Sequence, residues 1–337
     1  MLLRGASVLY SAAATWRRRW YARRPTRQRS LEQPVVSVGN LSTGGRGKSP
    51  VVAALARLLT SRGERPAILS RGYGRRRQPD GVTVVSDGSH VLADVESAGD
   101  EPLMLARALP HVPVLVASDR HLAGRMAETR FGATVHVLDD GFQHVALARD
   151  VDLVLIDDAD LEDRVLPAGR LREPLEALRT AGAILTAADS TAAGSVQHLA
   201  PGVPMFGVRR SLGTPEWVGS PAGTLHKHET RVFAAAAVAR PDRFFADLAA
   251  AGWNVTGAMA FRDHHWFDAA DIAKIESAAS AANAEAIVTT DKDAVRLEMH
   301  RLWLPVARIP LNVSIEPAEF DDWLMDRVRE ARLKPEA

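Results

Sequence analysis

Short apolar runs recur along the first two thirds of the chain, and patterns of helical spacing follow several of them. Strands are expected near residues 35–38, 66–70, 112–116, 134–139, 151–156 and 183–186. Apolar residues at helical spacing follow the first run between Val51 and Leu59, and again between Leu103 and Leu109. Strands that alternate with helices pair in parallel, so the pattern predicts an α/β fold with a parallel sheet flanked by helices.

The last third of the chain begins the same alternation again. Glycines and prolines interrupt the pattern between Val208 and Glu229, which predicts hairpin-like linker strands. Residues 231–236 and 286–290 then have the composition of strands, and a helix is expected around Phe244. We therefore expect a second, smaller α/β domain joined to the first by linker strands.

A glycine-rich turn separates the first predicted strand from the first predicted helix, and it reads GNLSTGGRGKSP over residues 39–50. Glycines let backbone N–H groups approach phosphate oxygens, and the helix N-terminus adds partial positive charge. Lys48 would reach the β- and γ-phosphates of a nucleotide, and the Ser49 hydroxyl would be a ligand of Mg²⁺. Ser42 stands where the usual motif has glycine. The candidate nucleotide-binding residues are Thr43, Gly44, Gly45, Arg46, Gly47, Lys48 and Ser49.

With this turn after its first strand, the expected sheet is of the P-loop NTPase type. Together with the patterns at the two ends of the chain, it predicts three segments. They are an amphipathic basic helix (residues 1–33), a nucleotide-binding domain (34–215) and a smaller α/β domain that closes over the nucleotide cleft (216–337).

Other predicted strands also end in polar residues, at the edge where α/β sheets bind ligands. Arg71 and Tyr73 follow one strand, and Arg120 follows another. They are candidates for holding an anionic or sugar-bearing substrate, although a solvated basic loop would look the same. Asp100 and Glu101 begin a helix, where acids are favourable simply by complementing the helix dipole.

Either of two strands could supply the carboxylate that lies beside the Mg²⁺ of a phosphate-binding loop. One ends in Asp139 and Asp140, and the other ends in Asp157 and Asp158. An apolar strand that ends in Asp is the expected arrangement in both cases. Their spacing alone does not choose between them.

Composition excludes several classes of protein. The 337 residues carry a net charge of only +1, which excludes a nucleic-acid binder that works by bulk charge. The chain has no cysteine, so disulfides and thiolate metal sites are excluded. The charge is unevenly placed, because eight arginines precede the first acidic residue, Glu32.

The amino-terminal segment has the pattern of an amphipathic helix. Its apolar face consists of Leu2, Ala6, Leu9, Ala13, Trp16 and Trp20. Arginines gather at its end, at positions 17, 18, 19, 23 and 24. Tryptophan together with arginine suits the headgroup layer of a membrane, and the alternative is a helix that packs this face on its own domain.

Several motifs, taken in order, closely resemble the tetraacyldisaccharide 4'-kinase family of lipid A synthesis. Besides the phosphate loop they are SRGYG (70–74), GDEP (99–102), LDDGFQH (138–144), LPAGRLREPL (166–175), FRDHH (261–265) and TDKDAV (290–295). The resemblance extends over nearly the whole chain.

The resemblance implies transfer of the γ-phosphoryl group of ATP to the 4'-hydroxyl of a tetraacylated glucosamine disaccharide 1-phosphate. It implies a peripheral protein at the cytoplasmic face of the bacterial inner membrane, whose partners are this lipid and the membrane surface. We expect no nucleic-acid partner, and the resemblance does not imply a protein partner. It accepts Ser42 and assigns the metal-binding acids to Asp139 and Asp140.

The family's catalytic base falls on Asp100, assisted by a histidine that corresponds to His264. The Mg²⁺ ligands implied are Ser49, Glu101, Asp139 and Asp140, and further candidate substrate contacts are His144, Arg172 and Glu173. If the first helix is a tether, deleting residues 1–25 should release the protein from membranes and spare turnover on detergent-dispersed lipid.

Two other functions remain open from the residues. A membrane-tethered ATPase switch of the partitioning type has a similar loop, but it needs lysine where this chain has Thr43. A kinase that uses the same chemistry on another hydroxylated acceptor would carry the same motifs.

Overall fold

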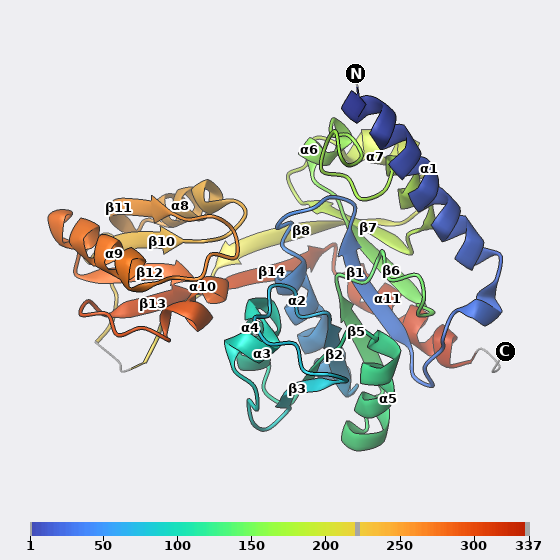
Figure 1. Ribbon diagram of the computed structural model, residues 1–337, viewed down its shortest axis with the longest axis horizontal. Helices are drawn as coiled ribbons and strands as arrows, with labels where there is room; N and C mark the ends of the chain where they lie inside the picture. The colour runs from blue at the N-terminus through green and yellow to red at the C-terminus, as the bar shows by residue number, and fades with distance from the viewer. Residues whose placement is uncertain (1, 220–222, 334–337) are drawn as a thin grey trace.

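The computed structural model describes residues 2–219 and 223–333 and contains a large and a small α/β body (Figure 1). The large body is built on a nine-stranded sheet in the order β14-β8-β7-β6-β1-β5-β2-β4-β3. Its strands are β1 (Val35–Asn40), β2 (Pro66–Ser70), β3 (Thr83–Asp87), β4 (Pro113–Val116), β5 (Val135–Asp139), β6 (Val151–Leu155), β7 (Ala183–Ala187), β8 (Met205–Leu212) and β14 (Leu311–Glu316). Only the edge strands β3 and β14 pair antiparallel, so the expected parallel sheet is confirmed.

Helices cover both faces of this sheet because its central strands are apolar on both sides. In β1, Val36 and Val38 pack into the core beneath α2 and α4, whereas Val35 packs on the opposite face with α5. The helices of the large body are α1 (Leu2–Ala22), η1 (Pro25–Arg27), α2 (Lys48–Ser61), α3 (Val95–Ala98), α4 (Asp100–Ala108), α5 (Arg120–Phe131), α6 (Asp158–Leu161), η2 (Leu175–Thr180), α7 (Ala193–Leu199) and α11 (Glu319–Arg332).

The small body has a five-stranded sheet in the order β11-β10-β12-β13-β9. Its elements are β9 (Glu216–Trp217), β10 (Arg231–Ala236), α8 (Pro241–Ala250), β11 (Asn254–Ala260), α9 (Ala269–Ala281), β12 (Ala286–Thr290), α10 (Asp291–Leu297) and β13 (Val306–Ile309). Only the two-residue strand β9 runs antiparallel to its neighbour.

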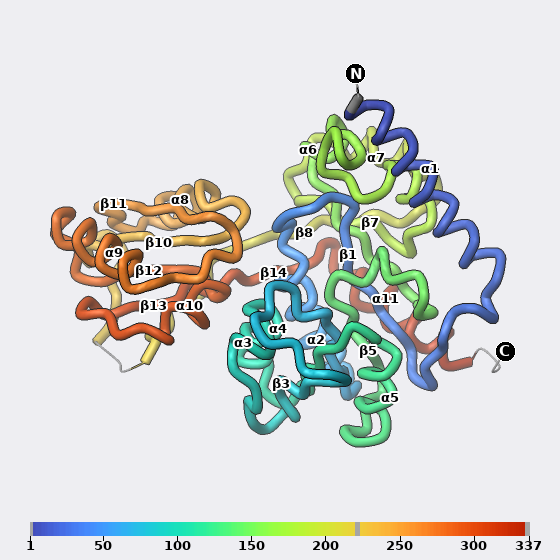
Figure 2. The backbone as a smooth tube through the Cα atoms, in the orientation of Figure 1, coloured from blue at the N-terminus to red at the C-terminus, as the bar shows by residue number. Residues whose placement is uncertain are grey.

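Two long strands link the bodies. Strands β8 and β14 pair antiparallel over six residues, and Figure 2 shows both running from the large body toward the small one. The chain enters the small body after β8 and returns through β14, and α11 then packs Phe320 and Leu324 into the core that holds Val36. The expected second domain, 216–337, thus contains a last strand and helix that belong to the large sheet, because their apolar side chains are buried there.

Candidate active site

The phosphate loop has the backbone that its glycines allow. Gly47 has φ 77° and caps α2, which begins at Lys48. A Cβ on Gly39 would lie 2.4 Å from the Cβ of Phe142, so only glycine lets β1 pass the loop that follows β5. The amine of Lys48 donates to Asn40 Oδ1 at 2.9 Å and lies 3.5 Å from Asp140. The predicted lysine therefore points along the loop toward the end of β5.

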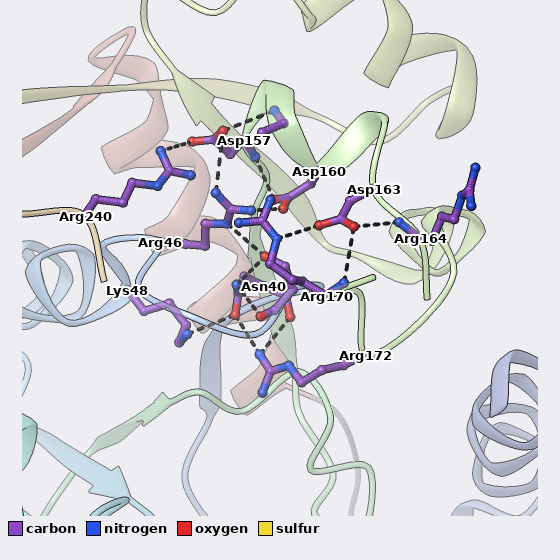
Figure 3. A network of polar contacts seen from close by, with 12 residues as sticks. Asn40, Arg46, Lys48, Asp157, Asp160, Asp163, Arg164, Arg170, Arg172 and Arg240 are labelled. Carbon is purple, nitrogen blue, oxygen red and sulfur yellow. Dashed lines mark hydrogen bonds and ion pairs between the residues drawn. The ribbon is translucent and has the colours of Figure 1, made fainter. Parts of the chain in front are cut away.

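The side chain of Arg46 points toward Asp157 and Asp160 and away from the amine of Lys48 (Figure 3). Its Nε donates to Ser42 Oγ at 2.8 Å, and its guanidinium pairs with the fully buried Asp160. Asp157 lies 3.6 Å from the same guanidinium and accepts a hydrogen bond from Arg240 of the small body at 2.9 Å. These ion pairs connect the phosphate loop to α6 of the large body and, through Asp157, to Arg240 of the small body. Because the Arg46 side chain is engaged in them, Arg46 can contact a phosphate only through its backbone N–H.

The two competing acidic strands lie on either side of β1, because β1 pairs with both β5 and β6. Asp157 after β6 caps α6 and is paired with arginines. Asp139 at the end of β5 is 2% exposed, and its Oδ1 has no hydrogen-bond partner among the described residues. Burial and the nearby charge of Glu101 raise the pKa of Asp139 to about 7. Asp139 therefore has one carboxylate oxygen without a partner in the described residues, whereas Ser70 Oγ lies 3.5 Å from the other.

Asp140 adopts a left-handed backbone conformation, with φ 56°, and turns its carboxylate toward basic groups. Arg172 donates to both of its oxygens at 2.8 Å and also donates to Asn40 Oδ1 at 2.6 Å. Desolvation would raise the pKa of Asp140, but Lys48 and Arg172 outweigh it and hold this pKa well below its ordinary value. Asn40, Lys48, Asp140 and Arg172 therefore form one polar cluster at the phosphate loop.

Ser49, Asp139 and Asp140, at this edge of the sheet, are oxygen ligands of the kind that a phosphate-bound magnesium ion takes. Asp139 Oδ1 is buried without a hydrogen-bond partner among the described residues, and the nearby charges of Glu101 and Asp140 disfavour its ionised form, so a bound cation would stabilise it. In the described part of the chain, no three His, Asp or Glu side chains are close enough to hold a metal by themselves. Mg²⁺ usually takes one or two carboxylates and completes its shell with water and substrate phosphates, which matches this arrangement.

Asp100 is the second buried carboxylate of the site, and it begins α4 after Gly99. It pairs with Arg296 at very short range, and its Oδ2 lies 3.0 Å from His264 Nδ1 and 3.7 Å from Lys292. Burial raises the pKa of Asp100, but the His264 hydrogen bond and the charges of Lys292 and Arg296 outweigh burial and lower it to about 2. Asp100 is therefore ionised at neutral pH.

The contacts of His264 indicate which ring nitrogen carries the proton. Lys292 Nζ, a donor, lies 3.1 Å from Nε2, so Nε2 accepts. In neutral His264 the proton then belongs on Nδ1, where Asp100 Oδ2 at 3.0 Å accepts its hydrogen bond; Arg296 Nη2 lies 3.3 Å from the same nitrogen and donates to Asp100 instead. His265 instead contacts Asp271 at 2.7 Å. Of the two adjacent histidines, the structure brings His264 to the acid.

Lys292 and Arg296 lie four residues apart on α10, so both side chains face Asp100 from one side of the helix. Lys292 also bridges Asp263 at 3.0 Å and Glu101 at 3.3 Å. Sequence reasoning did not identify Arg296, although its spacing from Lys292 was the available signal. The small body thus supplies His264, Lys292 and Arg296 to an acid of the large body.

Arg71, Arg75 and Arg120 lie close to one another, and no carboxylate of the described residues is within ion-pair distance of them. Arg120 is 5% exposed and donates only to the carbonyl of Ser118 among the described residues. Burial and the charge of Arg71 lower the pKa of Arg120 to about 10. Two nitrogens of Arg75, which sequence reasoning missed, are buried and have no hydrogen-bond partner in the described ranges. Burial and Arg120 lower the pKa of His144 to about 4. Guanidinium groups in this arrangement have the charge and the hydrogen-bond donors to bind an anion.

Of the remaining candidate substrate contacts, some are exposed to solvent, and one is already hydrogen-bonded to another residue of this chain. Tyr73 is 69% exposed, and its ring meets the ring of His264 edge-on at 5.1 Å between centroids. Arg71 is also exposed. Glu173 is buried and is already bound by Arg18 of α1. Tyr73 and Arg71 are therefore open to a ligand, whereas Glu173 has a partner from this chain.

A cavity of about 370 Å³ lies between the phosphate-loop helix and the link to the small body. Ser49 of α2, Asp291 of α10 and Asn312 of β14 are among the residues that line it. The cavity therefore borders both bodies, and a rotation of one body about the linker strands would change its shape.

A family profile, curated protein sequences and a crystal structure all match this chain over most of its length. The sequence profile described as Tetraacyldisaccharide-1-P 4'-kinase matches residues 1–329. A protein named tetraacyldisaccharide 4'-kinase from Koribacter versatilis is 41% identical over 321 residues, which cover 93% of this chain and 94% of that protein. Its namesake from Syntrophus aciditrophicus is 36% identical, with 98% and 93% covered. A crystal structure of LpxK from Aquifex aeolicus in complex with ATP superposes with a TM-score of 0.79 at 32% identity, covering 96% of this chain and 97% of that chain.

Proposed function

The chain belongs to the tetraacyldisaccharide-1-phosphate 4'-kinase family, and from this premise we propose that it transfers the γ-phosphoryl group of ATP to the 4'-hydroxyl of tetraacyldisaccharide 1-phosphate in lipid A biosynthesis. The observation that carries the proposal is the pairing of a buried carboxylate, Asp100, with His264 from the other body, next to a phosphate loop. A protein that only binds or hydrolyses ATP does not need this pair of Asp100 and His264 next to the phosphate loop.

In this mechanism the phosphate loop and Lys48 bind the triphosphate. Phosphoryl transfer spreads negative charge over the equatorial oxygens of the moving group, and the protein contributes mainly by positioning and by charge. Lys48 is held near the loop by Asn40, so little reorganisation is needed when phosphate binds. Closure of the small body over the nucleotide would bring Arg240 and α10 further toward it.

Asp100 orients the 4'-hydroxyl and accepts its proton. A carboxylate with a pKa near 2 is a weak base, but in a loose transition state the hydroxyl loses its proton late, when it has become much more acidic. The ion pairs with Arg296 and Lys292 keep Asp100 ionised and fixed in direction. His264 holds the carboxylate through Nδ1 and is a positioning residue for it.

Ser49, Asp139 and Asp140 would hold Mg²⁺ together with phosphate oxygens, with Glu101 nearby. When bound, this ion would neutralise the β- and γ-phosphate charge. The orphaned oxygen of Asp139 supports this assignment.

The arginine cluster near the ends of β2 and β5 suits the acceptor, which carries a phosphate of its own. Arg120, Arg71 and Arg75 have no carboxylate of the described residues within ion-pair distance, and a phosphate would supply the missing charge. Tyr73 and His144 lie at the same edge and would contact the sugar. Arg172 is occupied by Asp140 and Asn40, so it acts here through the metal-binding acid rather than on the lipid.

Helix α1 supports attachment to a membrane surface. Ser7 faces inward, and its Oγ donates to the carbonyl of Val165 at 2.8 Å. Most of the expected apolar face points outward, with Leu9 74% and Trp16 66% exposed, whereas Trp20 is half-buried. The side chain of Leu2 lies outside the described residues. No helix in the described ranges has the length and apolar character needed to cross a bilayer. We propose peripheral binding at the cytoplasmic face of the inner membrane.

Glutamate at both Leu9 and Trp16 should weaken binding to vesicles that contain anionic lipid by about tenfold or more, because two buried apolar contacts are replaced by charges that the bilayer repels. Sedimentation with phosphatidylglycerol vesicles measures this loss. Trp303→Glu, which changes an equally exposed tryptophan of the small body, is the control. Equal binding of both variants would reject α1 as the membrane contact.

One assay separates the proposed function from its alternatives. Purified protein is incubated with labelled ATP and detergent-dispersed tetraacyldisaccharide 1-phosphate, and lipid phosphorylation and free phosphate are measured together. We expect label on the lipid with little hydrolysis. Lipid-stimulated hydrolysis without transfer would favour the partitioning-type switch, and transfer only to other hydroxylated compounds would change the acceptor.

A further inference from the structure

The side chain of Arg18 extends from α1 and contacts two loops of the candidate active site. Its Nε and Nη2 atoms donate to the two carboxylate oxygens of Glu173 at 2.6 and 2.8 Å. Nη2 also donates to the carbonyl of Phe142 at 3.0 Å, and the guanidinium lies 4.0 Å from the centroid of the Phe142 ring. Nη1 lies 3.2 Å from Thr180 Oγ1. All three guanidinium nitrogens are used, and the side chain is 12% exposed.

Both loops that Arg18 contacts carry groups of the phosphate-binding cluster. Phe142 follows Asp140 by two residues, and Glu173 directly follows Arg172. Arg172 in turn bridges Asp140 and Asn40, the residue that accepts the Lys48 hydrogen bond. Arg18 therefore holds together the two loops whose separation sets the Arg172–Asp140 geometry.

Glu173 depends on this contact. Its side chain is 7% exposed, and among the described residues Arg18 is the only cation paired with it. A buried carboxylate that loses its partner must take up water or a proton, and either change moves the backbone beside it. A displacement of about 1 Å at a reacting group is enough to lower a rate about 100-fold.

From these contacts we propose that Arg18 is a positioning residue of the kinase, so that α1 is part of the catalytic assembly as well as its membrane contact. This inference rests on the proposed function. It also reverses the expectation that deleting residues 1–25 spares turnover, because the deletion removes Arg18.

The test compares Arg18→Met with Arg27→Met in the full chain. Arg27 is exposed, lies outside α1 and makes no side-chain contact that the structure records in its described part. With detergent-dispersed lipid, which makes membrane attachment unnecessary, Arg18→Met should lower kcat about 10- to 100-fold and leave the KM for ATP within about threefold. Arg27→Met should match the unmodified protein.

Two further variants distinguish positioning from general support of the fold. Arg18→Lys keeps the charge but loses the two-pronged hydrogen bond, so it should recover part of kcat at an unchanged thermal transition, and it carries the test if Arg18→Met fails to fold. Arg18→Met combined with Glu173→Gln should be more active than Arg18→Met alone, because the unpaired buried charge is gone.

The outcomes are separable. No transfer by the unmodified protein would overturn the proposed function and this inference with it. Normal transfer with equal kcat in Arg18→Met and Arg27→Met would overturn the inference alone. A loss of kcat that simply follows a lowered thermal transition, with no recovery in Arg18→Lys, would also overturn it.

Discussion

Replacing Asp100 with asparagine should lower phosphoryl transfer by about 10²- to 10⁴-fold, the range expected when a group that accepts the reacting proton is lost. Asparagine keeps the shape and can still accept one hydrogen bond, but it cannot take the hydroxyl proton. ATP binding should remain largely intact, because Lys48 and the phosphate loop do not depend on Asp100. Transfer to the lipid and equilibrium binding of ATP are the two measurements.

This substitution also has a structural cost that must be measured separately. Arg296 is 2% exposed and would lose its closest carboxylate, so the free energy of unfolding should fall by about 3 kcal/mol. His264→Asn avoids that problem, since Asp100 and Arg296 remain paired. It should lower kcat about 10- to 100-fold with little change in stability. Full turnover in a folded Asp100→Asn protein would exclude Asp100 as the proton acceptor.

Replacing Lys48 with alanine should lower phosphoryl transfer about 10³-fold and should also weaken ATP binding about tenfold or more. The amine is the cation that the loop directs at the β- and γ-phosphates, so its loss affects both the bound nucleotide and the transition state. The two substitutions therefore differ in one readout, because Lys48→Ala changes ATP affinity and Asp100→Asn does not.

Lys274→Ala is the matched control for Lys48→Ala, since Lys274 is mostly exposed on α9 of the small body. It should leave both ATP binding and transfer unchanged. Stability of Lys48→Ala should also be close to that of the unmodified protein, because Arg172 still neutralises Asp140. Unchanged ATP affinity in Lys48→Ala would contradict the assignment of this loop.

The predicted elements of the first half agree with the structure because they depend on local chemistry. The run of valines in β1, the glycines after it and the apolar pattern of α2 each restrict the backbone within a few residues. The small body was also predicted from its alternation. The return of β14 and α11 to the large sheet was not, since periodicity says that a helix has an apolar face but not which sheet covers it.

The carboxylates illustrate the same limit at the site. Asp139 and Asp157 end similar strands, and both strands adjoin β1, so only the partners around each acid distinguish them. The contact between Asp100 and Arg296 joins residues 196 positions apart. The Arg18 contact with Glu173 spans 155 positions. No spacing rule within one sequence reaches such distances.

By itself, the sequence determined the α/β class, the phosphate loop with its lysine, the amphipathic first helix and the motifs that indicate the family. The tertiary structure decided which charged groups are paired and which are left open. Arg46 pairs with Asp160, Asp139 keeps one oxygen without a partner among the described residues, and Asp100 pairs with cations of the small body. The reason is physical. Turns, caps and periodic faces act between neighbours in the chain, whereas ion pairing and burial depend on distances in space that only the folded chain establishes.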